Sequence, residues 1–128
     1  MSRKPGQDII QISNATIEII DIDICHVKFA AGIVLELEDF IETRETFEEL
    51  SRDKQLKGLY EFANYTTATY EARMYAQESV IESIAGAIVF NSLAQRILVR
   101  SYYLFNKQSH PVRIFTNREK AIEWLNSF

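Results

Sequence analysis

Residues 110–128, HPVRIFTNREKAIEWLNSF, decide the fold, because they read as one strand, one turn and one helix. Pro111 starts the expected strand, where a missing amide donor does least harm, and Val112 and Ile114 supply its apolar alternation. Thr116 is predicted to cap the helix, with Glu119 at the reciprocal capping-box position. The helix then carries an apolar stripe that must dock on another element: Ala121, Trp124, Leu125 and Phe128. We expect this stretch to be the last strand-helix unit of a wound sheet.

The hydrophobic patterns before this stretch predict the same alternation of strands and helices. β-Branched residues indicate two strands, at about residues 16–20 and 24–29, joined by a tight turn near residues 21–23. The pattern then predicts a helix from Leu37 to about Leu50, a strand at about 59–63 and a helix starting near Thr67 or Thr69. An apolar strand within residues 85–92 and a helix from Ser92 to about Lys107 follow. The order ββαβαβαβα predicts an α/β fold, with an N-terminal hairpin, βα repeats and a mostly parallel sheet.

Polar residues interrupt one face of the expected sheet. His26 and Lys28, Glu61, and Arg113 occupy alternate positions in three different strands. A sheet covered by helices on both faces would not easily accommodate them, because buried polar groups need partners. We therefore expect the helices to lie mainly on one face, with the other face partly open to solvent or to a partner.

The layout resembles that of the STAS domains, the fold of bacterial anti-sigma factor antagonists. It is most similar to small uncharacterised bacterial STAS-like proteins. The resemblance rests on the N-terminal hairpin, the helix opened by LELEDF, the strand followed by an Asn-containing loop, and the ending PVRIFTNREKAIEWL. It covers about Thr16 to Phe128 and implies a single STAS-like domain over residues 1–128. Residues 1–12 are polar enough that we expect them to form a flexible tail.

The loop that carries the family's switch differs in this chain. Signalling STAS domains have an Asp-Ser-Ser-Gly element at the start of the helix after the third strand, and a serine in it accepts the phosphate. Here the corresponding stretch is NYTTATYEA, which has neither an Asp-Ser pair nor a glycine. Its threonines serve either as helix caps, which threonine favours, or as modification sites. The candidate interaction or modification loop is Asn64, Tyr65, Thr66, Thr67 and Thr69.

Composition narrows the classes of function. The chain has 128 residues and a net charge of -4, which argues against a protein that binds nucleic acid through its phosphate backbone. The single cysteine, Cys25, and the absence of a signal-peptide pattern at the N-terminus predict a cytoplasmic location. The longest apolar run is too short to span a membrane. Cys25 and His26 are adjacent on a strand and point to opposite faces, so we expect no metal site.

The residues suggest a binding protein rather than an enzyme. None of the four glycines flanks a nucleophile, as an activated serine or cysteine requires, and we expect no cofactor and no catalytic residue. The helix from Ser92 to about Lys107 has more apolar surface than one sheet contact needs. This surplus indicates either a broad core face or a homodimer surface formed by Leu98, Tyr102, Tyr103 and Phe105. The predicted function is a non-enzymatic interaction or regulatory domain, and the alternative is a carrier of a small apolar ligand.

Overall fold

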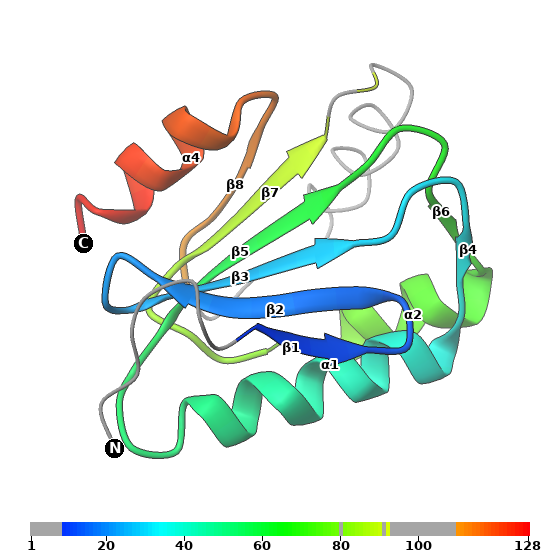
Figure 1. Cartoon of the computed structure of the whole chain (residues 1–128), viewed down its shortest axis with the longest axis horizontal. Coiled ribbons are helices and arrows are strands. Elements are labelled where there is room, and N and C mark those ends of the chain that lie inside the picture. The colour runs from blue at the N-terminus through cyan, green and yellow to red at the C-terminus, as the bar shows by residue number, and fades with distance from the viewer. Residues whose placement is uncertain (1–8, 80, 91, 93–109) are drawn as a thin grey trace.

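The structure is a computed structural model that describes residues 9–79, 81–90, 92 and 110–128. Its centre is a six-stranded sheet with the order β1-β2-β3-β5-β7-β8 (Figure 1). The strands are β1 (Ile10–Ile12), β2 (Ala15–Ile20), β3 (Ile24–Phe29), β5 (Lys57–Phe62), β7 (Gly86–Phe90) and β8 (Val112–Phe115). The pairs β1–β2 and β2–β3 are antiparallel, and the pairs β3–β5, β5–β7 and β7–β8 are parallel. The predicted α/β fold with a mostly parallel sheet is confirmed.

Three described helices flank this sheet. Helices α1 (Leu37–Leu50) and α2 (Tyr70–Glu78) lie on one side, and α4 (Arg118–Leu125) lies on the other (Figure 1). A second sheet of two very short strands, β4 (Val34–Leu35) and β6 (Thr67–Ala68), lies beside one end of the large sheet. None of the helices in the described part of the chain has the length and apolar character needed to cross a membrane.

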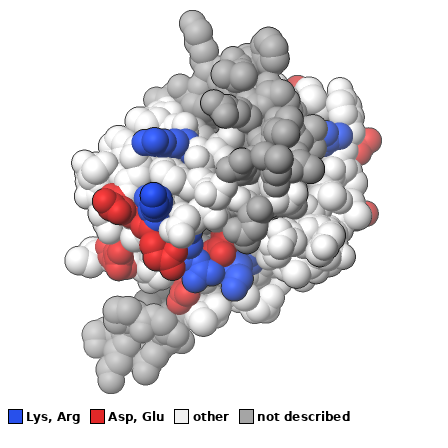
Figure 2. Space-filling view, turned by 90° about the horizontal axis from the view of Figure 1, so that it is seen from above, with Lys and Arg blue, Asp and Glu red and all other residues white. Residues whose placement is uncertain are grey.

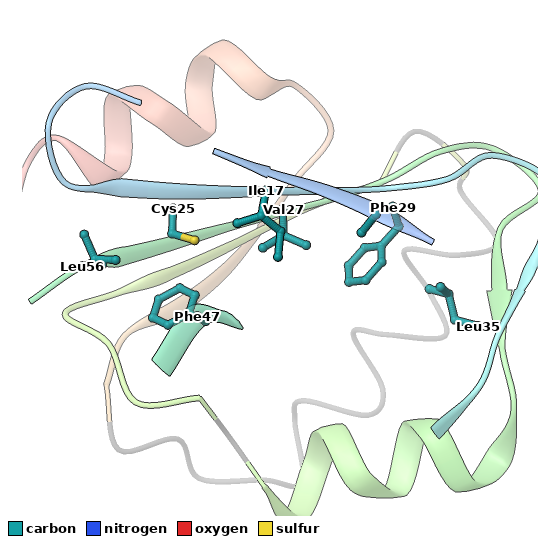
Figure 3. Packing of buried hydrophobic residues seen from close by; sticks show 8 residues of the cluster. Ile17, Cys25, Val27, Phe29, Leu35, Phe47 and Leu56 are labelled. Atoms are coloured by element: carbon teal, nitrogen blue, oxygen red, sulfur yellow. The ribbon is translucent and has the colours of Figure 1, made fainter. Parts of the chain in front are cut away.

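The larger core lies between the sheet and α1. Phe47 of α1 is fully buried against side chains of β2 and β3 (Figure 3). The buried members of this cluster are Ala15, Ile17, Cys25, Val27, Phe29, Leu35, Phe47 and Leu56. Burying a side chain of this size contributes about 1.5–3 kcal/mol, so this cluster is a main source of the stability of the fold.

Helix α1 begins where the side chain of Asp39 can satisfy several donors. One carboxylate oxygen accepts the Glu36 backbone N–H at 2.8 Å, which completes the first turn of the helix. The other accepts the amide of Asn14 at 2.8 Å, from the turn between β1 and β2. The buried Asp39 therefore joins the start of α1 to the N-terminal hairpin.

The opposite face of the sheet is only partly covered. Ala121 and Leu125 of α4 are fully buried in a second cluster with Ile24, Leu59 and Val89 from three strands. The other two members of the expected apolar stripe are less enclosed: Trp124 is half-buried, and Phe128 is 48% exposed. The prediction that the helices lie mainly on one face therefore holds for the described helices.

Two local predictions are wrong. The N-terminal cap of α4 is Asn117, whose side chain accepts the Lys120 backbone N–H at 3.0 Å. Thr116 is exposed and precedes the cap, because β8 ends at Phe115 and the chain needs one further residue to turn. The flexible tail expected over residues 1–12 is also too long, because Ile10–Ile12 pair with Ala15–Ile17 as an edge strand.

One expected element lies outside the described residues. The predicted helix that starts at Ser92 falls almost entirely within residues 93–109, and so do the four residues of the predicted dimer surface, Leu98, Tyr102, Tyr103 and Phe105. Both remain predictions.

Candidate interaction site at the carboxyl ends of the central strands

The loops that follow β3 and β5 meet in the small sheet. Val34 pairs with Thr67, and Leu35 pairs with Ala68, in parallel register. The Thr67 N–H donates to the Ile33 carbonyl at 3.0 Å, and the Thr69 N–H donates to the Leu35 carbonyl at 2.9 Å. These loops extend from the carboxyl ends of two neighbouring parallel strands, which is where open α/β sheets usually bind their ligands.

The structure brings the residues of the predicted loop together but gives its three threonines different roles. Thr69 caps α2, because its hydroxyl accepts the Ala72 backbone N–H at 3.2 Å. Thr66 is buried and donates its hydroxyl to the Ala30 carbonyl at 2.7 Å, which ties the two loops together. Thr67 is exposed in β6. The capping role considered for these threonines is therefore confirmed for Thr69.

Three large apolar or aromatic side chains project from these two loops and from the first residue of α2. Val34 is 57% exposed, Tyr65 is 87% exposed and Tyr70 is 64% exposed. Tyr65 also has a φ of 67°, a left-handed conformation that costs a non-glycine residue about 1–3 kcal/mol. We call Val34, Tyr65 and Tyr70 the loop patch. Asn64, from the same predicted loop, is exposed beside it.

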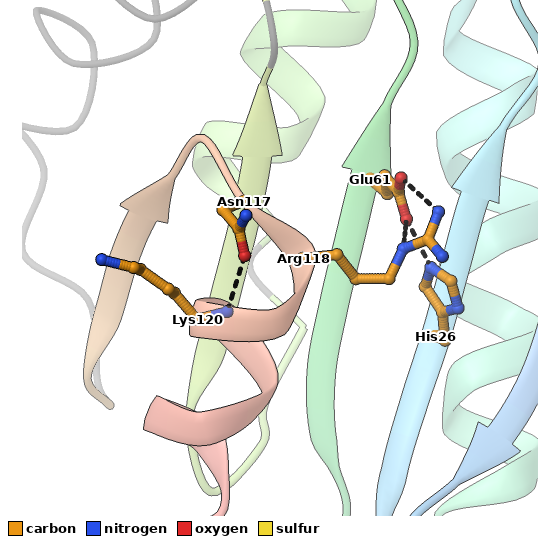
Figure 4. A network of polar contacts seen from close by, with 5 residues as sticks. All are labelled: His26, Glu61, Asn117, Arg118 and Lys120. Carbon is orange, nitrogen blue, oxygen red and sulfur yellow. Dashed lines mark hydrogen bonds and ion pairs between the residues drawn. The ribbon is translucent and has the colours of Figure 1, made fainter.

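A second polar cluster connects α4 to the partly open face of the sheet (Figure 4). Arg118, the first residue of α4, donates from Nε to Glu61 Oε1 and from Nη2 to Glu61 Oε2, both at 2.8 Å. His26 Nε2 lies 2.8 Å from the same Oε1. The side chains of His26 and Glu61 are about one-tenth exposed, and that of Arg118 is 42% exposed. We call these three residues the α4 clasp.

The clasp holds the Glu61 carboxylate in its ionised form. Burial alone would raise the pKa of Glu61, but the hydrogen bonds from Arg118 and then from His26, with their charges, bring it below its ordinary value of 4.5. Both oxygens of the carboxylate already accept hydrogen bonds, so the group is suited to anchoring α4 rather than to moving protons. The strand pattern predicts His26 and Glu61 on one face, but no local signal marks Arg118 as their partner, because it lies 57 positions from Glu61.

The other two polar residues that the sequence predicts on this face are exposed. Lys28 and Arg113 lie at the surface, and Arg113 stacks its guanidinium 5.3 Å from the centre of the Phe115 ring. A view from above shows acidic and basic side chains interleaved rather than separated by sign (Figure 2).

A cavity of about 120 Å³ lies between the sheet, α1 and α2. Its walls are mostly apolar and include five aromatic side chains, from Phe29, Phe40, Tyr60, Phe62 and Tyr75. The polar part of the wall comes from Thr43, Arg44, Ser79 and His110. This cavity was not expected from the sequence, because its lining residues come from six separate segments.

Metal-ligating residues do not cluster in the described part of the chain, where no group of three or more His, Cys, Asp or Glu side chains could hold an ion. Cys25 lies in the core beneath α1, where burial raises the pKa of its thiol to about 12. His26 lies on the opposite face in the α4 clasp, as expected for neighbours on a strand.

Comparison with known proteins identifies the fold and a family without a known activity. A family model described as "Domain of unknown function (DUF7793)" matches residues 18–128. No curated protein is similar enough to the chain to count as a match. The chain resembles the crystal structure of an uncharacterised protein of the DUF3478 family from Shewanella loihica PV-4, which has a SpoIIAA-like fold. The TM-score is 0.60 with 17% sequence identity, and the match covers 98% of each chain. The predicted STAS-like fold is thereby confirmed.

Proposed function

Since the chain belongs to the DUF7793 family, whose function is unknown, we propose that it is a non-enzymatic interaction domain that contacts a protein partner through the loop patch. The observation that carries this proposal is the exposure of Val34, Tyr65 and Tyr70 at the carboxyl ends of β3 and β5. These three residues are half of the large apolar side chains that are exposed in the described part of the molecule.

The chemistry of the patch defines the partner that would fit it. Tyrosine side chains are enriched at protein interfaces because they bury a large rigid area and keep a polar tip. Exposed carboxylates flank the patch, with Glu36 after β4 and Glu71 after Tyr70. A complementary partner therefore offers apolar pockets for the two tyrosines, surrounded by lysine or arginine side chains.

A site-specific photo-crosslinker at position 65 tests this proposal in the host cell. We expect one dominant cross-linked protein. That protein is then produced in pure form, and its affinity for the domain is measured. Tyr65→Ala and Tyr70→Ala should each weaken binding by roughly tenfold or more, as hot-spot residues do. Ile22→Ala is the control, because Ile22 is likewise a large exposed side chain, at 82%, but lies in the turn between β2 and β3. Unchanged affinity in both tyrosine variants would contradict the proposal.

We propose that the interaction is not switched by phosphorylation of the loop. The Thr66 hydroxyl donates to the Ala30 carbonyl, and the Thr69 hydroxyl caps α2, so both have structural partners. Intact-mass analysis of protein isolated from its host should show no phosphorylated fraction. A substantial fraction mapping to Thr66, Thr67 or Thr69 would restore a switch of the anti-sigma-antagonist type.

Three further parts of the proposal need separate tests. We propose that the domain is a cytoplasmic homodimer. Light scattering on the protein as it leaves a size-exclusion column tests the dimer, and fractionation of host cells tests the location. The absence of enzymatic activity is tested with a panel of metabolites. Turnover by the purified protein that is lost on a single substitution would contradict it.

The second candidate function is a carrier of a small apolar ligand. The cavity beneath α1 and α2 favours it, because binding pockets are typically apolar with a few polar groups. Native mass spectrometry of protein purified from its host separates the two candidates. A bound small molecule supports the carrier, and a ligand-free protein that still binds its partner supports the interaction domain.

A further inference from the structure

We propose that the cavity between the sheet, α1 and α2 binds one uncharged aromatic ring. This inference rests on the second candidate function, and it is independent of the loop patch, which lies on the loops after β3 and β5. The size of the cavity gives the first argument. Its volume is about 120 Å³, close to the roughly 150 Å³ of an apolar cavity that takes up benzene.

The aromatic lining gives the second argument. Phe29 packs edge-on against Phe40, with ring centres 5.7 Å apart, and stacks on Phe62 at 4.6 Å. Tyr60 and Tyr75 complete the aromatic part of the wall. Rings packed against one another keep their orientation, so they present fixed faces and edges to a guest. An aromatic guest can meet those faces and edges in the offset or edge-on geometry that rings prefer.

The polar part of the wall indicates that the guest carries no net charge. Arg44 is the only lysine or arginine among the described lining residues, and its Nε donates to Glu48 Oε1 at 2.6 Å. Its Nη1 donates to the Ser79 carbonyl at 3.3 Å. Burial lowers the pKa of His110, more than the charge of Glu82 raises it, so the imidazole is neutral near pH 7. A charged guest would lose part of its hydration and would meet no opposite charge among the described lining residues that lacks a partner of its own.

Two small residues keep the space open where larger ones would fit. A Cβ added at Gly86 would come no closer than 3.7 Å to any atom, which is an ordinary contact. Ala76 lines the cavity from α2, where a longer apolar side chain would be compatible with the helix. Gly58 is different, because a Cβ there would lie 2.6 Å from the Tyr60 hydroxyl oxygen. A Cβ at position 58 would therefore force the Tyr60 ring to move, whereas one at position 86 would displace nothing.

Titration of the full chain with phenol, followed by amide NMR shifts, tests the proposal. We expect saturable shifts at residues that line the cavity, with 1-naphthol as a two-ring probe that does not bind. Gly86→Ala and Ala76→Leu fill part of the space, so each should weaken phenol binding by roughly tenfold or more. Gly86→Ala should also raise the melting temperature of the unliganded protein, because its added methyl group makes only ordinary contacts.

The control is Ala31→Leu, which makes the same change as Ala76→Leu at an exposed loop position and should leave phenol binding unchanged. Absence of saturable shifts in the wild-type protein would overturn the proposal, and so would equal binding of 1-naphthol or undiminished binding in both filled variants. The affinity of the loop patch for its partner is measured on the same variants. A failure of phenol binding with partner binding intact removes the cavity proposal alone.

Discussion

Replacing Glu61 by glutamine should loosen the attachment of α4 to the sheet. The substitution keeps the shape of the side chain but removes its charge and one of its two acceptor oxygens. Arg118 then loses the carboxylate that accepts two hydrogen bonds from it, and the His26 ring loses its contact with an ionised oxygen. The amide NH₂ group also faces a guanidinium, and both are donors.

The expected loss in the free energy of unfolding is about 2.5–4 kcal/mol, summed from two contacts of unequal burial. The Arg118 side chain is 42% exposed, so solvent screens its pair with Glu61, which contributes about 1 kcal/mol. The His26–Glu61 contact is shielded on both sides, and a hydrogen bond to a charged group contributes about 1.5–3 kcal/mol. Small domains are stable by about 5–15 kcal/mol in total, so the change is readily measured.

Urea unfolding followed by tryptophan emission is a suitable assay. Trp124 is the only tryptophan of the chain and lies in α4, with its ring 5.6 Å from that of Phe115 and 4.9 Å from that of Phe128. Its emission therefore reports whether α4 is docked. Glu18→Gln is the matched control, since Glu18 lies opposite His26 on the neighbouring strand but its side chain makes no hydrogen bond or ion pair within the described residues.

The pH dependence provides a second reading of the same variant. The folded protein holds the pKa of Glu61 below its ordinary value of 4.5, so the unfolded chain binds this proton more readily. The stability that Glu61 provides is fully present above that value and is lost as the pH falls through the lower, folded pKa. The difference between wild type and Glu61→Gln should therefore shrink in acid. Equal urea midpoints at neutral pH, with unchanged Trp124 emission, would refute the anchoring role of the clasp.

Three other predictions concern single side chains. Asn117→Ala should destabilise the protein by about 1 kcal/mol through the lost cap, whereas Thr116→Ala should change the urea midpoint little. A larger loss of stability in Thr116→Ala than in Asn117→Ala would contradict the assignment of the cap. Trp124→Ala should cost about 2–3 kcal/mol by calorimetry, less than a fully buried ring at about 3–5 kcal/mol, because Trp124 is only half-buried. Burial raises the pKa of the Cys25 thiol to about 12, so Cys25 should react with a thiol reagent at pH 8 only as fast as the protein unfolds. Rapid labelling of the native protein would show instead that the core around Cys25 opens.

The sequence predicts the strands and helices well where periodicity decides them. The strand at residues 24–29 is found with its observed bounds, because β-branched residues mark it and the turn before it is tight. The cap of α4 is not predicted correctly, since Thr116 and Asn117 are both good cap residues and the end of β8 decides which of them caps the helix. Local propensity does not resolve that one-residue difference.

The candidate sites depend on contacts that the sequence does not encode locally. The strands β4 and β6 have two residues each and exist because two loops meet, so no periodic pattern marks them. Glu61 and Arg118 are likewise brought together by the crossover from β7 to β8 and the turn into α4. The loop residues 64–69 were identified only because the family places its switch there.

The cover that α4 provides has a consequence for how the protein is made in the cell. The chain emerges from the ribosome in order, so β3, β5 and β7 are synthesised before α4. Until α4 follows, Ile24, Leu59 and Val89 lack the helix that buries them. A nascent chain at this stage would expose an apolar strip across three strands, the kind of surface that aggregates or recruits chaperones. Truncation before Asn117 should therefore give a protein that assembles its sheet but is lost to aggregation or proteolysis.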